Sequence, residues 1–340
     1  LRAGLLGTLN EDERSQQVEA ARRLVQAYRL LGDVPQVLIP LGDLLEDTAI
    51  VESLCREPEL IPILRARQAL CADAEVDDRL LWTLIEAEVW LLRGEGDEVD
   101  AATRTRCARE AAEAALRALA IDSQSVMALL LLRQATAPAP DSGGELGSKP
   151  SYSPDEAARQ RAYALYTLRL AGLLSHADTK AELYSEAAQI FLKLGDQESG
   201  AAALRTVLDS APYDSAAFSR LHALLTARAE DAARGDSGPL IELLNFRLAL
   251  EPEDDMQRRM EQSLRVSLLL QRAGLLQAAG QIKEAAADLE SLLQIDPRQP
   301  VAHRRLAEIQ TQHGQATAAI SHYEQFLQHG GNPAERQAVH

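Results

Sequence analysis

Cysteine and aromatic residues are scarce in this chain of 340 residues, of which aromatic side chains make up only 4%. Cys55, Cys71 and Cys107 are odd in number, widely spaced and form no metal-binding or redox motif, so we expect single thiols buried in helices. Unpaired thiols favour a reducing compartment over an oxidising one. No stretch sustains the apolar–polar alternation of a half-buried strand, so the sequence predicts an all-α chain.

Positive charge is also scarce. Lysine occurs at only four positions, and the net charge is −16. A nucleic-acid binder needs clustered Lys and Arg to displace counterions from phosphates, and docking on anionic lipid needs similar clusters, so the composition argues against both kinds of partner. Because nearly all the cations are arginine, we interpret the composition as that of a GC-rich, bacterial genome.

Long hydrophobic runs are absent. The longest apolar run is far short of the roughly 20 residues that span a bilayer, which argues against direct membrane insertion. The chain begins at Leu1 rather than Met, as an excised fragment would, so the lack of a recognisable signal peptide proves little. We expect a cytoplasmic protein, with the periplasm as the alternative.

Patterns typical of catalysis, cofactor binding or metal binding are lacking as well. The segment Gly235–Pro239 has the letters of a serine-protease nucleophile segment but helical surroundings, so we expect Asp236 or Ser237 to cap a helix there. The glycine-rich segment 143–149 has the wrong spacing for a phosphate loop, and no strand precedes it. The seven histidines show no ligand spacing. We therefore predict no enzymatic activity, no cofactor and no metal site.

The chain does contain an internal repeat, clearest between Val266 and Pro333. Three pairs of residues match at a spacing of 34: Ala273 with Ala307, Gly280 with Gly314, and Ala285 with Ala319. A period of this length is typical of stacked helical hairpins. Gly280 ends the first helix, and small residues at 273 and 285 would let the two helices of one hairpin approach closely. One hairpin cannot bury its apolar side alone, so its neighbours must stack on it.

In these residues the chain resembles the tetratricopeptide repeat family. The family pattern falls on the following residues of the first copy: Leu269, Arg272, Ala273, Leu276, Gly280, Ala285, Leu289 and Pro297. Arg272 departs from the family's Leu, and Ala273 departs from its Gly. Further matches lie at 300–333, 181–214 and, more weakly, 18–51. The resemblance implies a right-handed α-solenoid of stacked helix-turn-helix hairpins, and it is unspecific for function.

The pattern predicts three regions along the chain. Residues 1–135 form degenerate hairpins, residues 136–156 form a flexible Pro-, Gly- and Ser-rich loop or linker, and residues 157–340 form a better-matched array. Ser153 is expected to cap a long helix after the linker. From Asp254 to Ala279 we predict one helix A that is lengthened by about three turns.

The resemblance also implies a partner-binding groove lined by particular positions of each helix A. Carried onto this sequence, those positions are Glu19, Arg22, Gln26, Arg29, Glu182, Ser185, Gln189, Lys193, Leu270, Gln277, Arg304, Glu308 and Gln312. The Lys and Asn pattern with which some members clamp a peptide carboxylate is missing. The mixed, partly apolar set suits an extended or helical segment of a protein ligand.

One charge anomaly lies between Asp73 and Asp100, where ten carboxylates face two arginines. Part of this region is a candidate acidic docking rim for a basic partner, formed by Glu86, Glu88, Glu95, Asp97, Glu98 and Asp100. The alternative is a solvated face without a binding role.

The leading hypothesis is a non-catalytic scaffold that binds a segment of another protein, as a member of a larger multiprotein assembly would. One alternative is a regulatory module of a longer polypeptide that carries an enzyme or transcription domain. Another is a structural protein whose end repeats stack on further copies. The sequence does not indicate the oligomeric state or name the partner.

Overall fold

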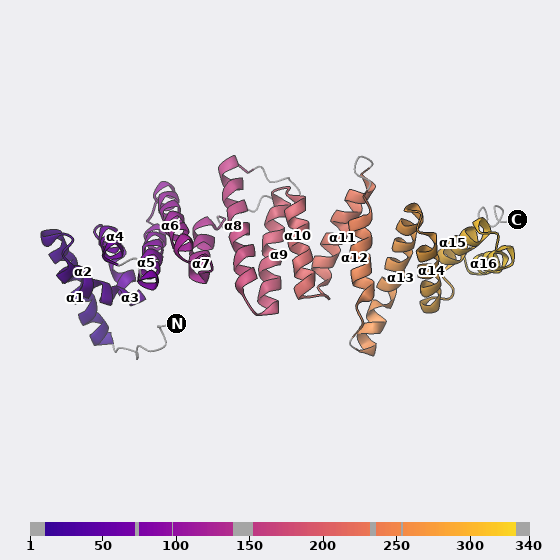
Figure 1. Cartoon of the computed structure of the whole chain (residues 1–340), viewed down its shortest axis with the longest axis horizontal. Helices are drawn as coiled ribbons and strands as arrows, with labels where there is room; N and C mark the ends of the chain where they lie inside the picture. The colour runs from indigo at the N-terminus through magenta and orange to yellow at the C-terminus, as the bar shows by residue number, and fades with distance from the viewer. Residues whose placement is uncertain are drawn as a thin grey trace. The chain divides into compact units, whose positions relative to one another are not determined.

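The computed structural model describes residues 11–71, 75–96, 98–138, 152–231, 236–252 and 254–330, and all regular secondary structure within these ranges is α-helical (Figure 1). The helices belong to two compact units, Leu1–Ala211 and Pro212–His340. In each unit most successive helices pack against one another. The predicted all-α solenoid of stacked hairpins is confirmed.

The first unit contains α1 (Glu11–Leu31), α2 (Pro35–Leu45), α3 (Thr48–Leu54), α4 (Leu60–Leu70), α5 (Val76–Gly94), α6 (Ala101–Ile121), α7 (Val126–Thr136), α8 (Pro154–Leu173), α9 (Ala177–Lys193) and α10 (Gln197–Ser210). The second unit contains α11 (Ser215–Glu230), α12 (Gly238–Ala249), α13 (Asp255–Ala278), α14 (Ile282–Ile295), α15 (Pro300–Gln312) and α16 (Ala316–His329).

Packing in the first unit also reaches beyond the nearest neighbour. Helix α1 contacts α3, α2 contacts α4, α3 contacts α5, and α5 contacts α7. This is the stacking expected when each hairpin covers the apolar side of the one before it. Helix α5 therefore belongs to two hydrophobic clusters, one through Trp82 and Val89 and the other through Ala87 and Leu91.

The best-matched repeat has the construction that its sequence predicts. Gly280 joins α13 to α14 with a φ of 76°, in the left-handed region that a residue without Cβ adopts at little cost. Ala273 and Ala285, on the two helices of this hairpin, are fully buried. Helix α13 is 24 residues long, so the predicted lengthening of this helix is confirmed.

Arg272, which stands where the family pattern has Leu, forms a buried ion pair. Its Nε lies 2.7 Å from Oδ2 of Asp288 on α14, and its second terminal nitrogen contacts the other carboxylate oxygen. The Asp288 side chain is only 8% exposed. The two halves of this hairpin are thus joined by a bidentate ion pair where the family packs an apolar side chain.

Helix starts follow the predicted caps. The Ser153 hydroxyl accepts a hydrogen bond from the backbone N–H of Glu156, and Pro154 occupies the first turn of α8. At the start of α12, Asp236 accepts from the N–H of Gly238, whereas Ser237 makes no side-chain capping bond. Of the two residues proposed as the cap of α12, Asp236 therefore has this role.

Arginines of later helices bind carbonyl oxygens at the ends of earlier ones. Arg93 donates to the carbonyls of Cys55 and Glu57 after α3, and Arg104 donates to that of Gly94 at the end of α5. The last carbonyls of a helix have no partner within the helix, so these guanidinium groups satisfy them. The arginine bias thus also serves the packing of the helices.

The Pro-, Gly- and Ser-rich segment 136–156 lies inside the first unit. Helices α7 and α8 flank it and pack against each other. Residues 139–151 lie outside the described residues, so the predicted flexibility of this segment stays a prediction. The three cysteines are free, and Cys55 and Cys107 are buried as predicted, whereas Cys71 is half-buried just after α4.

Candidate functional site

A groove of about 870 Å³ opens in the first unit, where residues of α2, α3, α5, α7 and α8 line it. Its apolar lining comes mainly from α5 and α7. Leu81, Leu84 and Leu91 line it from α5. From α7, Met127 and Leu130 line it with side chains that are 54% and 40% exposed. Exposed leucine and methionine side chains gathered in a concave surface are typical of a site that binds another molecule.

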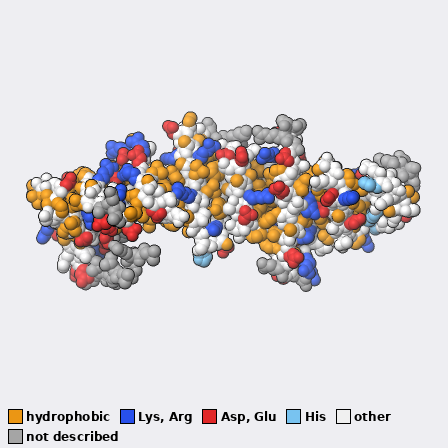
Figure 2. Space-filling view, in the orientation of Figure 1, with side chains coloured by type: hydrophobic (Ala, Val, Ile, Leu, Met, Phe, Trp, Pro, Cys, Tyr) orange, Lys and Arg blue, Asp and Glu red, His pale blue; other side chains and the backbone are white. Residues whose placement is uncertain are grey.

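Three carboxylates line the same groove, those of Glu46, Glu88 and Glu95. Glu88 is half-buried on α5 between the apolar residues of the groove. Burial raises the pKa of its carboxyl, and the negative charge of Glu52 on α3 raises this pKa further. In Figure 2, acidic side chains lie beside hydrophobic ones over α3 and α5, whereas Lys and Arg side chains gather over α6.

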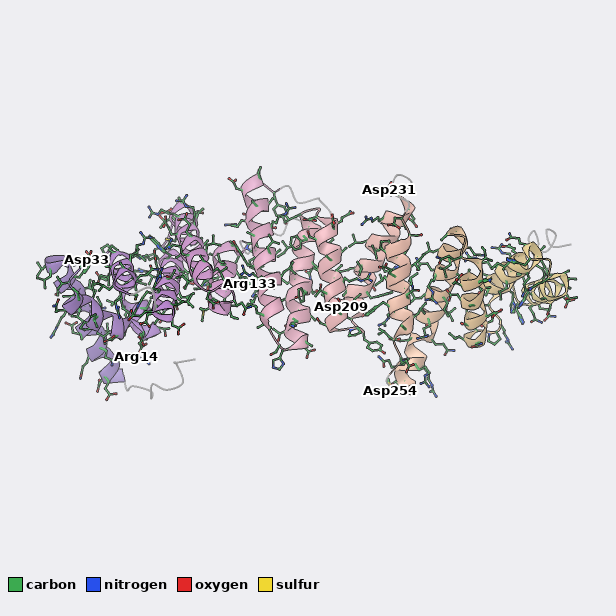
Figure 3. All side chains as sticks on the ribbon, in the orientation of Figure 1. Arg14, Asp33, Arg133, Asp209, Asp231 and Asp254 are labelled. Atoms are coloured by element: carbon green, nitrogen blue, oxygen red, sulfur yellow. The ribbon has the colours of Figure 1, made fainter. Side chains whose placement is uncertain are left out.

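The arginine in the groove lining, Arg133, is held by other residues of the unit. It lies where α7 meets α8 (Figure 3). Its guanidinium pairs with Glu186 at 2.6 Å and lies 5.3 Å from the ring centre of Tyr163. The Tyr163 hydroxyl donates to the same Glu186. Arg133 is therefore neutralised within the fold, which leaves the carboxylates of the groove to set its charge.

Glu86 does not belong to an accessible acidic rim, so this part of the sequence prediction is wrong. Its side chain is 1% exposed. Its two carboxylate oxygens pair with Arg65 of α4 at 2.7 Å and with Arg117 of α6 at 2.8 Å. Glu88 lies two positions after Glu86 along α5, and a helix turns by about 200° over two positions. The two side chains therefore point to different sides, one into the packing and one into the groove.

The remaining rim residues have different surroundings. Glu95 is exposed and accepts a hydrogen bond from Gln134 of α7. Glu98 is exposed. Asp100 caps α6, because its carboxylate accepts from the N–H and the hydroxyl of Thr103. Asp97 lies outside the described residues. Among the rim residues that the structure describes, Glu88 and Glu95 are the two that line the groove.

None of the family-derived positions lines this groove. The positions on α1 and α9 are exposed or half-buried, and Arg29 forms ion pairs with Glu57 and Glu59. In the second unit, Leu270 and Gln277 are half-buried on α13, Gln312 is exposed, and Arg304 pairs with Glu308 on α15. The groove was missed because its residues come from the degenerate repeats, where the family phase is hard to assign. The sequence feature that could have indicated the groove is the apolar run 126–132. Its side chains surround the helix, so one buried side cannot cover all of them.

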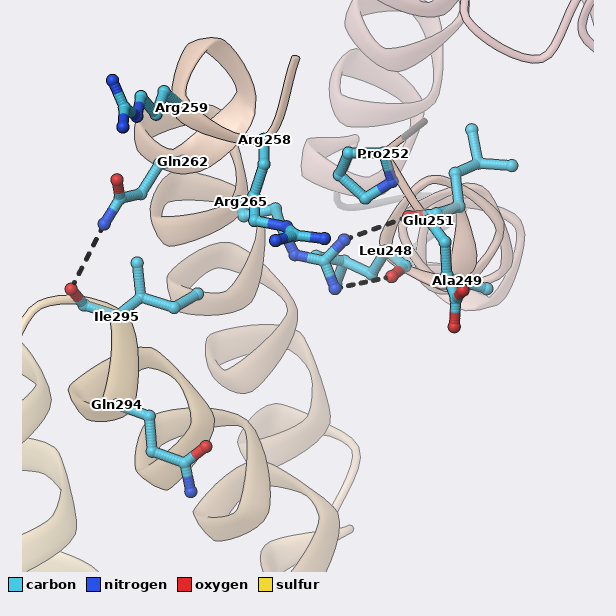
Figure 4. A pocket seen from close by; sticks show the side chains of 11 residues that line it. Leu248, Ala249, Glu251, Pro252, Arg258, Arg259, Gln262, Arg265, Gln294 and Ile295 are labelled. Carbon is cyan, nitrogen blue, oxygen red and sulfur yellow. Dashed lines mark hydrogen bonds between the residues drawn. The ribbon is translucent and has the colours of Figure 1, made fainter. Parts of the chain in front are cut away.

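The second unit has a cavity of about 880 Å³ beside the end of α12 (Figure 4). Arg265 crosses it and donates to the carbonyls of Leu248 and Leu250 at 2.9 and 3.1 Å. Gln262 donates to the carbonyl of Ile295. These bonds satisfy carbonyls at the ends of α12 and α14, so Arg265 and Gln262 have a structural role at this cavity.

Sequence spacing also missed a contact between two histidines. His303 on α15 is buried, and its Nδ1 lies 2.9 Å from Nδ1 of His322 on α16. The described residues contain no cluster of three or more His, Cys, Asp or Glu side chains that could hold a metal ion. Among the same residues, no helix has both the length and the apolar character that crossing a bilayer requires.

The fold and the groove define a helical-repeat scaffold. A tetratricopeptide repeat profile matches residues 276–339, which include the predicted repeat at 300–333. The resemblance noted in the sequence is therefore confirmed. A search among curated proteins found no match.

Three solved structures show a distant likeness to the chain. The Cut9–Hcn1 hetero-tetramer of the APC/C has a TM-score of 0.29 at 13% identity, and the match covers 93% of this chain and 58% of that one. BtubC from P. vanneervenii has a TM-score of 0.23 at 16% identity, with coverages of 83% and 90%. Yeast Tom70 also scores 0.23, at 13% identity, with coverages of 96% and 84%. Scores this low support no inference about the function of this chain.

Proposed function

We propose that this chain is a non-catalytic scaffold that binds a segment of another protein in the groove of its first unit. The observation that carries the proposal is the groove lining, in which Met127 and Leu130 remain exposed beside the carboxylates of Glu88 and Glu95. Burying these two apolar side chains under a partner would be favourable, at roughly 25 cal/mol per Å² of apolar surface. The free thiols support a cytoplasmic location.

The charge of the groove indicates the chemistry of the partner. Arg133, the cation among the described residues that line the groove, is paired with Glu186 rather than with these carboxylates. A partner segment with Lys or Arg residues would complement this surface. The exposed carboxylates, Glu95 and Glu98 among them, would speed the encounter more than they tighten the final complex.

Affinity capture with two matched variants tests the proposal. Leu130→Asp places a charge in the groove, whereas Leu116→Asp places one on α6, outside the groove lining, at a leucine with similar exposure (47% against 40%). Partners captured from the source cell by the parent chain and by Leu116→Asp should be lost with Leu130→Asp. Circular dichroism should show that all three proteins are equally helical. Capture of the same partners by Leu130→Asp would show that the groove is not the binding surface.

A further inference from the structure

The floor of the groove follows one side of α5. Its residues recur at helical spacing from Leu81 through Leu84 and Leu91 to Glu95, with Glu88 in the middle. This stripe extends for about 20 Å, at 1.5 Å per residue. Helices α3 and α7 each pack on α5 and contribute to the lining. The groove is therefore a trough on the surface of a helix, with further helices at its edges.

A trough of this composition suits a helix better than an extended chain. An extended segment would place its own backbone N–H and C=O groups against leucine side chains. The polar side chains available to meet them are few, because Arg133 is paired with Glu186 and Gln134 donates to Glu95. Unpaired backbone groups are costly away from water, whereas a helix satisfies its own. Apolar ridges spaced at i, i+3, i+4 and i+7 also match the ridges of a second helix.

Glu88 gives this trough one specific polar feature. Its carboxylate is half-buried in the middle of the apolar stripe, and it makes no hydrogen bond or ion pair with any other residue that the structure describes. Glu52 lies near enough to disfavour its negative charge. An ammonium or guanidinium group placed there would neutralise a carboxylate that no described residue of the unit neutralises.

We infer that the groove takes an amphipathic α-helix whose apolar side lies on the α5 stripe and whose single Lys or Arg in that side pairs with Glu88. The inference rests on the proposed function and adds the conformation of the ligand and the residue that sets its specificity. Glu95, directly after the last residue of α5, contributes a second carboxylate at the end of the trough.

Display selection on the purified whole chain tests the inference with defined probes. The library holds randomised peptides of about 15 residues, a length that matches the stripe when helical. Selections run in parallel on the parent chain, Glu88→Gln, Glu98→Gln and Leu130→Asp. Glu98 is the matched control, because it is an exposed acid that does not line the groove. Parent and Glu98→Gln should both enrich peptides with apolar residues at i, i+3, i+4 and i+7 and one cation among them.

The decisive measurement is a double-mutant cycle. The affinities of the parent chain and of Glu88→Gln are measured for one enriched peptide and for a version of it in which Gln replaces the Lys. Glu88→Gln should weaken the Lys peptide by about tenfold or more and leave the Gln peptide unchanged, since the charge-assisted hydrogen bond exists only in the first pair. The inference would be overturned if Glu88→Gln lowered the affinity of both peptides equally, or if the selection enriched proline-rich extended sequences. In either case the proposed function of the groove would still stand. Peptides that bind Leu130→Asp as well as the parent would instead overturn the proposed function.

Discussion

The Nδ1 atoms of His303 and His322 face each other at 2.9 Å across α15 and α16. Nε2 of His303 lies 3.0 Å from the carbonyl oxygen of Pro297, which can only accept, so this nitrogen carries a proton. In the neutral pair, Nδ1 of His303 then accepts from the N–H of His322. Two charged rings would set one N–H against the other, so the contact tolerates at most one extra proton.

This contact predicts that the last hairpin loses stability in mild acid. Burial lowers the pKa of His322, His303 lowers it further, and Glu290 of α14 acts in the opposite direction. The folded hairpin thus binds fewer protons than the unfolded chain just below the ordinary histidine pKa of about 6.5, so its free energy of unfolding falls as the pH falls through that range. Hydrogen exchange of α15 and α16 between pH 7.5 and 5 should show this loss. His322→Gln should reduce the pH dependence, and the exposed His176→Gln should not; equal slopes in all three proteins would refute the assignment.

Glu86 and its two arginines predict an asymmetry between variants. Arg65 and Arg117 are about half exposed, so after Glu86→Gln their charges can turn to water. Arg65→Gln together with Arg117→Gln leaves the Glu86 carboxylate buried without a counter-charge, and the loss should approach the 3–5 kcal/mol typical of a broken buried pair. Urea unfolding should therefore rank the double arginine variant as less stable than Glu86→Gln. The reverse order would show that Glu86 is accessible to solvent.

Restoring the family residue at position 272 should destabilise the second unit. Arg272→Leu leaves Asp288 buried and without its ionic partner, at an expected cost of about 3–5 kcal/mol. Adding Asp288→Leu should recover most of this loss, because two apolar side chains can fill the space that the ion pair occupies. Thermal melting of the single and double variants measures the recovery. A double variant as unstable as Arg272→Leu would mean that packing, not the stranded charge, sets the cost.

Ala285 should not tolerate a large charged side chain. It is fully buried on α14, so Ala285→Arg overpacks the hairpin and buries a charge, which should cost about 3 kcal/mol or more. Ala287→Arg is the matched control, because Ala287 is exposed two residues further along the same helix. Chemical unfolding should separate the two variants clearly. Similar stabilities would show that the repeat phase is misassigned.

The acidic residues after α5 should act on the rate of association. Changing Glu95, Asp97, Glu98 and Asp100 together to Ser should slow binding of a basic partner at low salt and leave the fold intact. Serine retains the capping ability of Asp100 at α6. The difference from the parent should shrink as salt shortens the Debye length from about 10 Å at 0.1 M to about 3 Å at 1 M. Stopped-flow association measures it, and identical rates at low salt would make this loop only a solvated surface.

Local chemistry was sufficient to predict the hairpins. A cap such as Ser153, a turn glycine such as Gly280 and a small residue such as Ala285 each act on neighbours a few residues away. Their effects can therefore be read along the chain, and so can the helix boundaries and the 34-residue period. The same local information made the all-α class and the lengthened α13 predictable.

Contacts between distant residues were decided by the tertiary structure alone. Glu86 and Glu88 look alike in the sequence, yet one is enclosed by arginines of α4 and α6 and the other lines a groove. The pairing of His303 with His322 likewise depends on how two helices pack. The physical reason is that burial and charge pairing depend on which side of a helix meets a neighbour. In the degenerate repeats of residues 1–135, which supply most of the groove lining, the family pattern is too weak to settle that orientation. The groove could therefore be recognised only from the packed helices.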